Sequence, residues 1–179
     1  YTVEYTTDGQ SVNIVYSGAT KGWIPIEDDA VADVPVKLNT EGIFGFGHDA
    51  SGAVGMTNLV SNAGVVATDV SAVGTATYYI AACEYGYDKG IFGFGATAGD
   101  VLVNETNLVS NTGVVASDVT GVGTDRKAPA ACHYGGDKGI FGFGVGSGAT
   151  AVTNLVSNAG VVATDTTGVG TARYGLAAT

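Results

Sequence analysis

The chain has 179 residues, of which 45% are apolar and only 13% are charged, and its formal net charge is −10. This composition supports a packed core and excludes a disordered chain. With only 7 Lys and Arg, the chain lacks the cationic face that nucleic acid or anionic lipid requires. No apolar run reaches the roughly 18 residues of a membrane helix, and the first residues show no signal peptide.

The first forty residues are predicted to form a small separate β module or connector, residues 1–40. Residues 1–5 and 11–16 alternate apolar and polar side chains on either side of a turn-forming segment, which predicts a hairpin. The only tryptophan, Trp23, follows in a segment that ends in an acidic turn.

The rest of the chain, residues 41–179, consists of three copies of one unit. Gly-Ile-Phe-Gly-Phe-Gly is followed each time by Thr-Asn-Leu-Val-Ser-Asn, by Gly-Val-Val-Ala-(Thr/Ser)-Asp and by Val-Gly-Thr, with offsets of 47 to 49 residues. We place the units at about 41–75, 76–124 and 125–171. Residues 172–179 match the first strand of a further unit and are predicted to be an orphan strand.

Each unit is predicted to hold four short strands, because β-branched residues dominate the runs and no helical period is present. The first strand is 77–83, with its copy at 127–132. The Gly-Ile-Phe-Gly-Phe, Thr-Asn-Leu-Val and Val-Val-Ala-Thr strings form the other three. The expected fold is all-β, with three tandem four-stranded repeats of about 48 residues that resemble propeller blades. A β-trefoil-like fold is the alternative. Three blades are too few to close a propeller, which typically has four to eight.

The second strand has one bulky face and one nearly bare face. Phe44 and Phe46 are two residues apart, which predicts that both point to one side of the strand, with Gly45 on the other. Glycine weakens a strand unless a neighbour approaches its backbone closely. We therefore expect Gly45, Gly93 and Gly142 to lie against a Phe ring or a backbone of another unit.

Two resemblances bear on function. The order Arg-x-x-x-Ala-Ala, then Lys-Gly-Ile-Phe-Gly-Phe-Gly, then Asn-Leu-Val, resembles a kelch repeat, although the usual paired glycine is here Gly-Phe-Gly and the late tryptophan is absent. The longer string from Thr-Asn-Leu-Val-Ser-Asn to Gly-Val-Gly-Thr-Ala-Arg resembles repeats of phage tail-fibre-like and other virion structural proteins. This resemblance implies a non-enzymatic structural or attachment protein of a virion or other extracellular assembly, with no cofactor.

The implied partners are further copies of the chain, with a trimer favoured by analogy to fibre proteins, and other virion or surface proteins or a host-surface glycan. Two further functions stay open. One is a secreted bacterial adhesin or filament subunit that polymerises by strand exchange, and the other is a glycan-binding module.

Few residues are candidates for chemistry, and no catalytic, cofactor or metal set is expected. The recurring aspartates Asp69, Asp118 and Asp165 are interpreted as turn residues rather than as Ca²⁺ ligands. Cys83 and Cys132 occupy one small-residue position of the repeat and are expected to be buried thiols that are not bonded to each other. Adjacent residues of a strand point to opposite faces, so Cys132 and its neighbouring histidine do not predict a dyad.

The candidate interaction surface is aromatic. Tyr85, Tyr87, Tyr134 and Tyr174 cluster around the predicted first strands, where they either bind a partner or sugar or pack at a sheet edge. The orphan strand would carry assembly through Arg173, Tyr174 and Leu176. Because an apolar strand with unpaired edges invites pairing with another chain, we expect the protein to self-associate.

Overall fold

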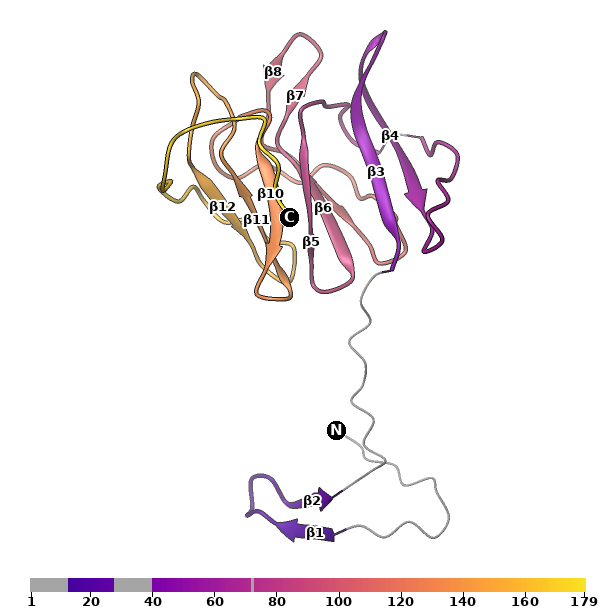
Figure 1. The fold of residues 1–179 in the computed structure, drawn as a ribbon, viewed down its shortest axis with the longest axis vertical. Helices are drawn as coiled ribbons and strands as arrows, with labels where there is room; N and C mark the ends of the chain where they lie inside the picture. The colour runs from indigo at the N-terminus through magenta and orange to yellow at the C-terminus, as the bar shows by residue number, and fades with distance from the viewer. Residues whose placement is uncertain (1–12, 28–39, 72) are drawn as a thin grey trace. The chain divides into compact units, whose positions relative to one another are not determined.

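The computed structural model describes residues 13–27, 40–71 and 73–179, and these residues form an all-β protein without helices. The chain divides into two compact units, Tyr1–Val36 and Lys37–Thr179 (Figure 1). Within the described ranges there is no helix long and apolar enough to span a membrane.

In the described part of the first compact unit, β1 (Asn13–Tyr16) and β2 (Trp23–Glu27) form an antiparallel hairpin. The Tyr16 and Trp23 rings pack with their centroids 5.3 Å apart across this hairpin. The predicted strand at 11–16 therefore exists but pairs with the segment that follows it. Its predicted pairing with residues 1–5 lies outside the described residues.

The second compact unit contains one antiparallel sheet for each repeat, and the three sheets follow one another across the body in chain order (Figure 1). None of the described sheets closes into a barrel or a complete propeller. The strands are β3 (Gly42–Asp49) and β4 (Gly52–Val60) in the first sheet; β5 (Ala81–Tyr85), β6 (Lys89–Gly93) and β9 (Thr106–Val109) in the second; and β10 (Ala130–Tyr134), β11 (Lys138–Gly142) and β12 (Thr153–Val156) in the third. A short hairpin of β7 (Ala96–Thr97) and β8 (Val101–Leu102) extends from the second sheet.

The strand register repeats from unit to unit. The first phenylalanine of each motif pairs with the asparagine of Thr-Asn-Leu-Val: Phe44 with Asn58, Phe92 with Asn107 and Phe141 with Asn154. The order β5-β6-β9 in the second sheet is matched by β10-β11-β12 in the third. The pairing of the two motif strands thus recurs in all three sheets, with every strand antiparallel to its neighbours.

The first strand of each unit starts later than we predicted. It begins at Ala81 and Ala130, because the residues before it cross from one sheet to the next. In this crossing the Gly47 amide donates to the Thr77 carbonyl at 2.9 Å, and the Gly95 amide donates to the Arg126 carbonyl at 2.9 Å. These backbone groups bond across units instead of within a ladder.

The predicted fourth strand is present only as isolated bridges. In the second unit Val115 bridges Val109 and Val119 bridges Thr106, with no continuous ladder between them. The physical reason is a side chain, since Asn107 donates its amide to the Ala116 carbonyl at 3.1 Å in the middle of this segment. The same bond recurs from Asn58 and Asn154 in the other units.

Candidate functional site: the junction between repeat units

The centre of each junction is a phenylalanine ring packed on a glycine of the preceding unit. A β-carbon added to Gly93 would lie 3.0 Å from Cζ of Phe141, and one added to Gly45 would lie 2.9 Å from Cζ of Phe92. The predicted close approach is therefore confirmed at these two glycines. At Gly142 a β-carbon would meet only Thr153 of the same unit, at 3.3 Å. The predicted close approach of another unit is therefore not found at Gly142 within this chain.

The prediction that both phenylalanines of a motif share one face is wrong. Phe92 packs in a cluster with the first unit, whereas Phe94 packs in a cluster with Phe141 of the third unit. The cause is a positive φ at the second phenylalanine of every motif, 61° at Phe46, 64° at Phe94 and 63° at Phe143. This conformation interrupts the alternation of side chains along the strand, so the two rings of a motif point toward different neighbouring units.

The second phenylalanine extends the aromatic contact across the junction. The rings of Phe94 and Phe141 lie edge to face with centroids 5.2 Å apart, and those of Phe46 and Phe92 repeat this geometry at 5.2 Å. Edge-to-face pairs are a favoured arrangement that stabilises beyond the area they bury.

An aspartate clasp closes each junction on its outer side. Asp118 accepts hydrogen bonds from the backbone amide of Thr75 at 2.9 Å and from its hydroxyl at 2.7 Å, and Asn107 holds the carboxylate from within its own unit at 2.8 Å. Asp165 makes the same contacts to Thr124, at 3.0 and 2.6 Å. The recurring aspartates thus bind the preceding unit rather than only their own turn.

The hydrogen bonds of the clasp lower the pKa values of these two carboxyl groups. Partial burial opposes ionisation, but the hydrogen bonds from Asn107 and Thr75 outweigh it and hold the pKa of Asp118 below its ordinary value. The pKa of Asp165 is lowered by the same balance, with hydrogen bonds from Thr124 and Asn154. Both groups are therefore carboxylates at neutral pH, each serving as an acceptor for the preceding unit. In the described residues no group of three or more His, Cys, Asp or Glu is arranged to hold a metal ion.

Arg126 is a functional residue of the junction that the sequence analysis missed. It is fully buried, with its guanidinium 3.8 Å from the centroid of the Phe94 ring. It donates to the Phe143 carbonyl at 2.8 Å and to Oδ1 of Asn154 at 2.7 Å. Burial lowers its pKa to about 10, so it stays charged at neutral pH. The sequence repeat could have pointed to Arg126, since Arg173 occupies the equivalent position in the next copy of the repeat.

Leucines cover the inner rim of each junction. A β-carbon on Gly113 would overlap Leu59 of the first unit at 2.3 Å, and one on Gly160 would lie 2.9 Å from Leu108 and from Tyr85 of the second. Both glycines also have positive φ, 75° and 79°. Only glycine fits where the turn after Thr-Asn-Leu-Val contacts the preceding unit.

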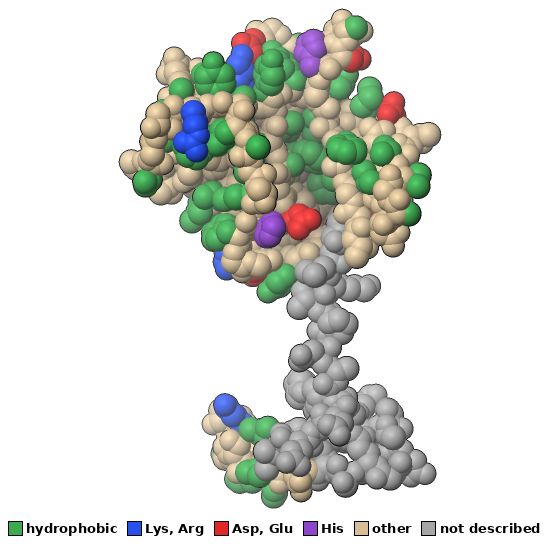
Figure 2. Space-filling view, viewed as in Figure 1, with side chains coloured by type: hydrophobic (Ala, Val, Ile, Leu, Met, Phe, Trp, Pro, Cys, Tyr) green, Lys and Arg blue, Asp and Glu red, His purple; other side chains and the backbone are tan. Residues whose placement is uncertain are grey.

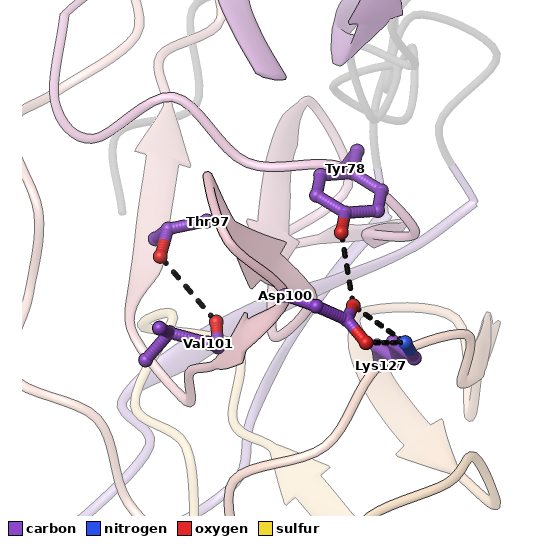
Figure 3. A network of polar contacts seen from close by, with 5 residues as sticks. All are labelled: Tyr78, Thr97, Asp100, Val101 and Lys127. Atoms are coloured by element: carbon purple, nitrogen blue, oxygen red, sulfur yellow. Dashed lines mark hydrogen bonds and ion pairs between the residues drawn. The ribbon is translucent and has the colours of Figure 1, made fainter. Parts of the chain in front are cut away.

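A polar cluster joins the β7–β8 hairpin to the segments that lead into the second and third sheets (Figure 3). Lys127 contacts both carboxylate oxygens of Asp100, and the Tyr78 hydroxyl donates to Oδ1 at 2.9 Å. The bond from Lys127 lowers the pKa of Asp100, and the carboxylate in turn raises the pKa of Tyr78. The cluster links these segments, because the Asp100 carboxylate accepts hydrogen bonds from both Lys127 and Tyr78.

The two cysteines lie at the junction between the second and third units. Cys83 and Cys132 are half-buried free thiols. Sγ of Cys83 would lie 2.5 Å from a β-carbon on Gly139 of the third unit, and burial raises the pKa of Cys83 to about 12. A thiol with so high a pKa is a poor nucleophile at neutral pH, so Cys83 serves packing.

The predicted tyrosine surface is only partly at the surface. Tyr85 is 4% exposed and belongs to the core between the second and third units, where it packs at the turn of Gly160. Tyr87, Tyr134 and Tyr174 are exposed, at 43%, 38% and 59%. Among the described residues no ring contact joins these three, so the structure gives them no shared binding face.

The predicted assembly strand is not part of a sheet within the single chain. Residues 171–179 are not paired as a strand there, and Arg173 stacks 4.0 Å above the Phe143 ring. Its carbonyl accepts from the Gly144 amide at 3.0 Å, as the Thr77 and Arg126 carbonyls do at the two internal junctions. Tyr174 is exposed and Leu176 half-buried. This segment thus lies on the third unit as a crossing segment.

The copies of the junction residues in the first and third units have no neighbouring unit among the described residues. On the first unit Phe44, Gly64, Val66 and Asp69 are exposed; on the third, Leu155 and Thr171 are exposed and Gly142 is buried. Phe44 is 63% exposed, against 5% and 0% for its copies Phe92 and Phe141. Figure 2 shows few charged side chains on the visible face of the repeat body, scattered among hydrophobic and uncharged ones.

A cavity of about 270 Å³ lies beside β3, between the first and second sheets. It is lined by Gly42 and Ile43 of β3 and by Ala82 and Cys83 of β5. Among the described strands β3 pairs only with β4, whereas β6 and β11 are paired on both edges. The cavity therefore marks the edge of β3 on which a first strand lies in the other units.

Comparison with known proteins adds no relative to this picture. No protein-family model matches the chain, and no curated protein matches it in sequence. The geometry of the junctions therefore carries the functional argument.

Proposed function

We propose that this chain is a non-enzymatic structural or attachment component of an extracellular assembly, and that its repeats are propeller-blade-like modules of a phage virion fibre or decoration protein. The observation that carries this proposal is the repeated junction, in which a ring, a clasp and a leucine rim bind each unit to the next. An array built from one repeated contact supplies length and rigidity, the properties that architecture needs.

Composition and the character of the buried polar residues support the proposal. Arg126 and Asn154 are fully buried, and their partners lie within the junctions, so these polar residues are used for cohesion. The surface is sparsely charged and has a net negative balance, which suits contact with protein or glycan rather than with nucleic acid.

The direct test is location. Antibodies raised against residues 41–179 should label fibres or the surface of purified particles in electron micrographs. Antibodies against an unrelated protein of the same source serve as the control. Labelling confined to soluble material, with bare particles, would contradict the proposal.

A further inference from the structure

We propose that the polar cluster around Asp100 forms, together with the aromatic rings beside it, a binding site for a neutral sugar of a glycan. The inference deepens the attachment role proposed above and rests on it. The site draws its residues from β3, from two crossing segments and from the β7–β8 hairpin, and we call it the aromatic platform: His48, Tyr78, Tyr79, Asp100 and Lys127.

Three rings form a continuous row on the aromatic platform. The His48 and Tyr78 rings lie edge to face with centroids 5.2 Å apart, and the Tyr79 ring follows with its centroid 5.0 Å from that of Tyr78. His48 is exposed and Tyr79 is 60% exposed, so these two rings present apolar surface to solvent rather than to the core. The C–H groups of a sugar ring suit such a surface, because the face of an aromatic ring carries negative charge.

The backbone of Tyr79 is strained in order to hold this exposed ring. Tyr79 has a φ of 52°, in the left-handed region that favours glycine. The equivalent residues of the following crossing segments are Ala128, with a φ of 51°, and Gly175, with a φ of 65°. Because a mostly exposed ring adds little to the core, packing does not offset the strain at Tyr79, and the strain indicates a role at the surface.

The polar part of the aromatic platform keeps free hydrogen-bonding capacity. Asp100 accepts from the Tyr78 hydroxyl at one oxygen and contacts Lys127 through both oxygens (Figure 3). These contacts use three of the roughly four acceptor positions of a carboxylate and leave at least one N–H of the ammonium group free. The Asp100 side chain is 54% exposed and that of Lys127 is 23% exposed, so an acceptor and a donor reach solvent side by side.

The aromatic and polar parts lie within reach of a single sugar ring. Nζ of Lys127 is 5.8 Å from the centroid of the Tyr79 ring. A sugar stacked on Tyr79 would therefore bring its hydroxyl groups to the ion pair of Lys127 and Asp100. One hydroxyl would donate to the carboxylate and its neighbour would accept from the ammonium group, and hydrogen bonds to charged groups are the stronger kind.

Charge favours a neutral ligand over a charged one. Lys127 already lies over the Tyr79 ring and pairs with Asp100, so a cationic ligand would meet a resident cation. An acidic ligand is disfavoured by the formal net charge of −10 of the chain. A neutral sugar avoids both costs and uses the donor and the acceptor together.

Backbone hydrogen bonds fix the aromatic platform before any ligand binds. Tyr78 and Ala96 of β7 exchange two backbone hydrogen bonds at 2.9 Å, and the Ala128 amide donates to the Tyr79 carbonyl at 2.7 Å. A site that is already ordered loses less freedom on binding, which favours affinity.

A glycan array tests the inference with the full chain. Neutral and sialylated oligosaccharides are presented on one carrier protein, and the neutral oligosaccharide with the strongest signal is then titrated by calorimetry. Tyr79→Ala should weaken binding by more than about tenfold, as loss of an aromatic anchor does. Asp100→Asn should weaken it several-fold, because a charge-assisted hydrogen bond becomes a neutral one.

Tyr87→Ala is the matched control. Tyr87 is also an exposed tyrosine, at 43%, and also has a positive φ, 71°, but it lies in the turn between β5 and β6. This variant should bind as the unaltered chain does. Tyr79→Phe keeps the ring and should also retain binding.

The outcomes are distinguishable. Circular dichroism and thermal melting establish that each variant is folded, and the Asp100→Asn titration decides if Tyr79→Ala does not fold. The inference would be overturned if no neutral glycan binds, if sialylated glycans bind better, or if Tyr79→Ala binds like the Tyr87→Ala control. Binding to the bare carrier would also overturn it and would indicate a protein partner. Any of these results with antibody-labelled particles would leave the proposed structural role in place.

Discussion

Gly93 and Gly142 hold the same position in successive sheets, but a side chain would meet different surroundings at each. We expect Gly93→Val to lower the free energy of unfolding by about 1–3 kcal/mol, because its β-carbon would meet Thr106 at 2.9 Å and Phe141 at 3.0 Å. Gly142→Val should lower the free energy of unfolding by less, because a β-carbon there would meet only Thr153. Urea melts compare the two, and equal losses would contradict the packed junction.

The clasp carboxylates predict a pH dependence of stability. The pKa values of Asp118 and Asp165 are lower in the folded chain than the ordinary value of about 4. Their contribution is therefore complete above that ordinary value and is lost as the pH falls through the lower folded value. Melting temperature should drop in that acidic range.

Substitution isolates this contribution. Asp118→Asn should lower stability at pH 7 by roughly 1 kcal/mol, because a charged acceptor is lost, and should flatten the acidic drop. Asp69→Asn is the control, since Asp69 binds no preceding unit in the described structure. Identical pH profiles for the two variants would contradict a role for the clasp.

At the scale of elements, the crossing segments do more than connect sheets. Arg126 lies in such a segment and binds groups of the third unit from a fully buried position. Arg126→Ala should cost about 3 kcal/mol or more, because it empties a buried site and leaves two acceptors unpaired. Arg173→Ala, at the exposed equivalent position, should cost about 1 kcal/mol or less. Chemical denaturation of both variants is the measurement.

An exposed ion pair holds the β7–β8 hairpin, so this contact should contribute little to the free energy of unfolding. Asp100→Ala should lower stability only slightly, with a smaller loss in high salt, because exposed ion pairs are weak and screened. Titration of Tyr78 reports the same contact, since its raised pKa should fall back in this variant. A pKa unchanged by the substitution would show that the cluster does not form.

At the scale of the whole molecule, each unit is stabilised by its neighbours. β6 is paired on both edges and lies between two junctions, whereas β3 is paired only with β4 among the described strands. The amides of β3 should therefore exchange hydrogen faster than those of β6. Faster exchange in β6 would contradict the nearest-neighbour picture.

The amino-acid sequence alone determined the repeat, the all-β class and the close approach at Gly45 and Gly93, because these depend on periodicity and on residue size. It did not reveal that the two phenylalanines of a motif face different neighbours, which follows from one positive φ per motif. It also missed Arg126, which stacks on the Phe94 ring of the preceding unit.

Tertiary structure decided what the local pattern left open. The recurring aspartates looked like turn residues, yet Asp118 and Asp165 bind threonines 43 and 41 residues away. Tyr85 looked like a surface aromatic, yet it is buried because the third unit covers it. Contacts between units depend on how sheets stack, and stacking joins residues whose spacing along the chain carries no periodic signal within one unit.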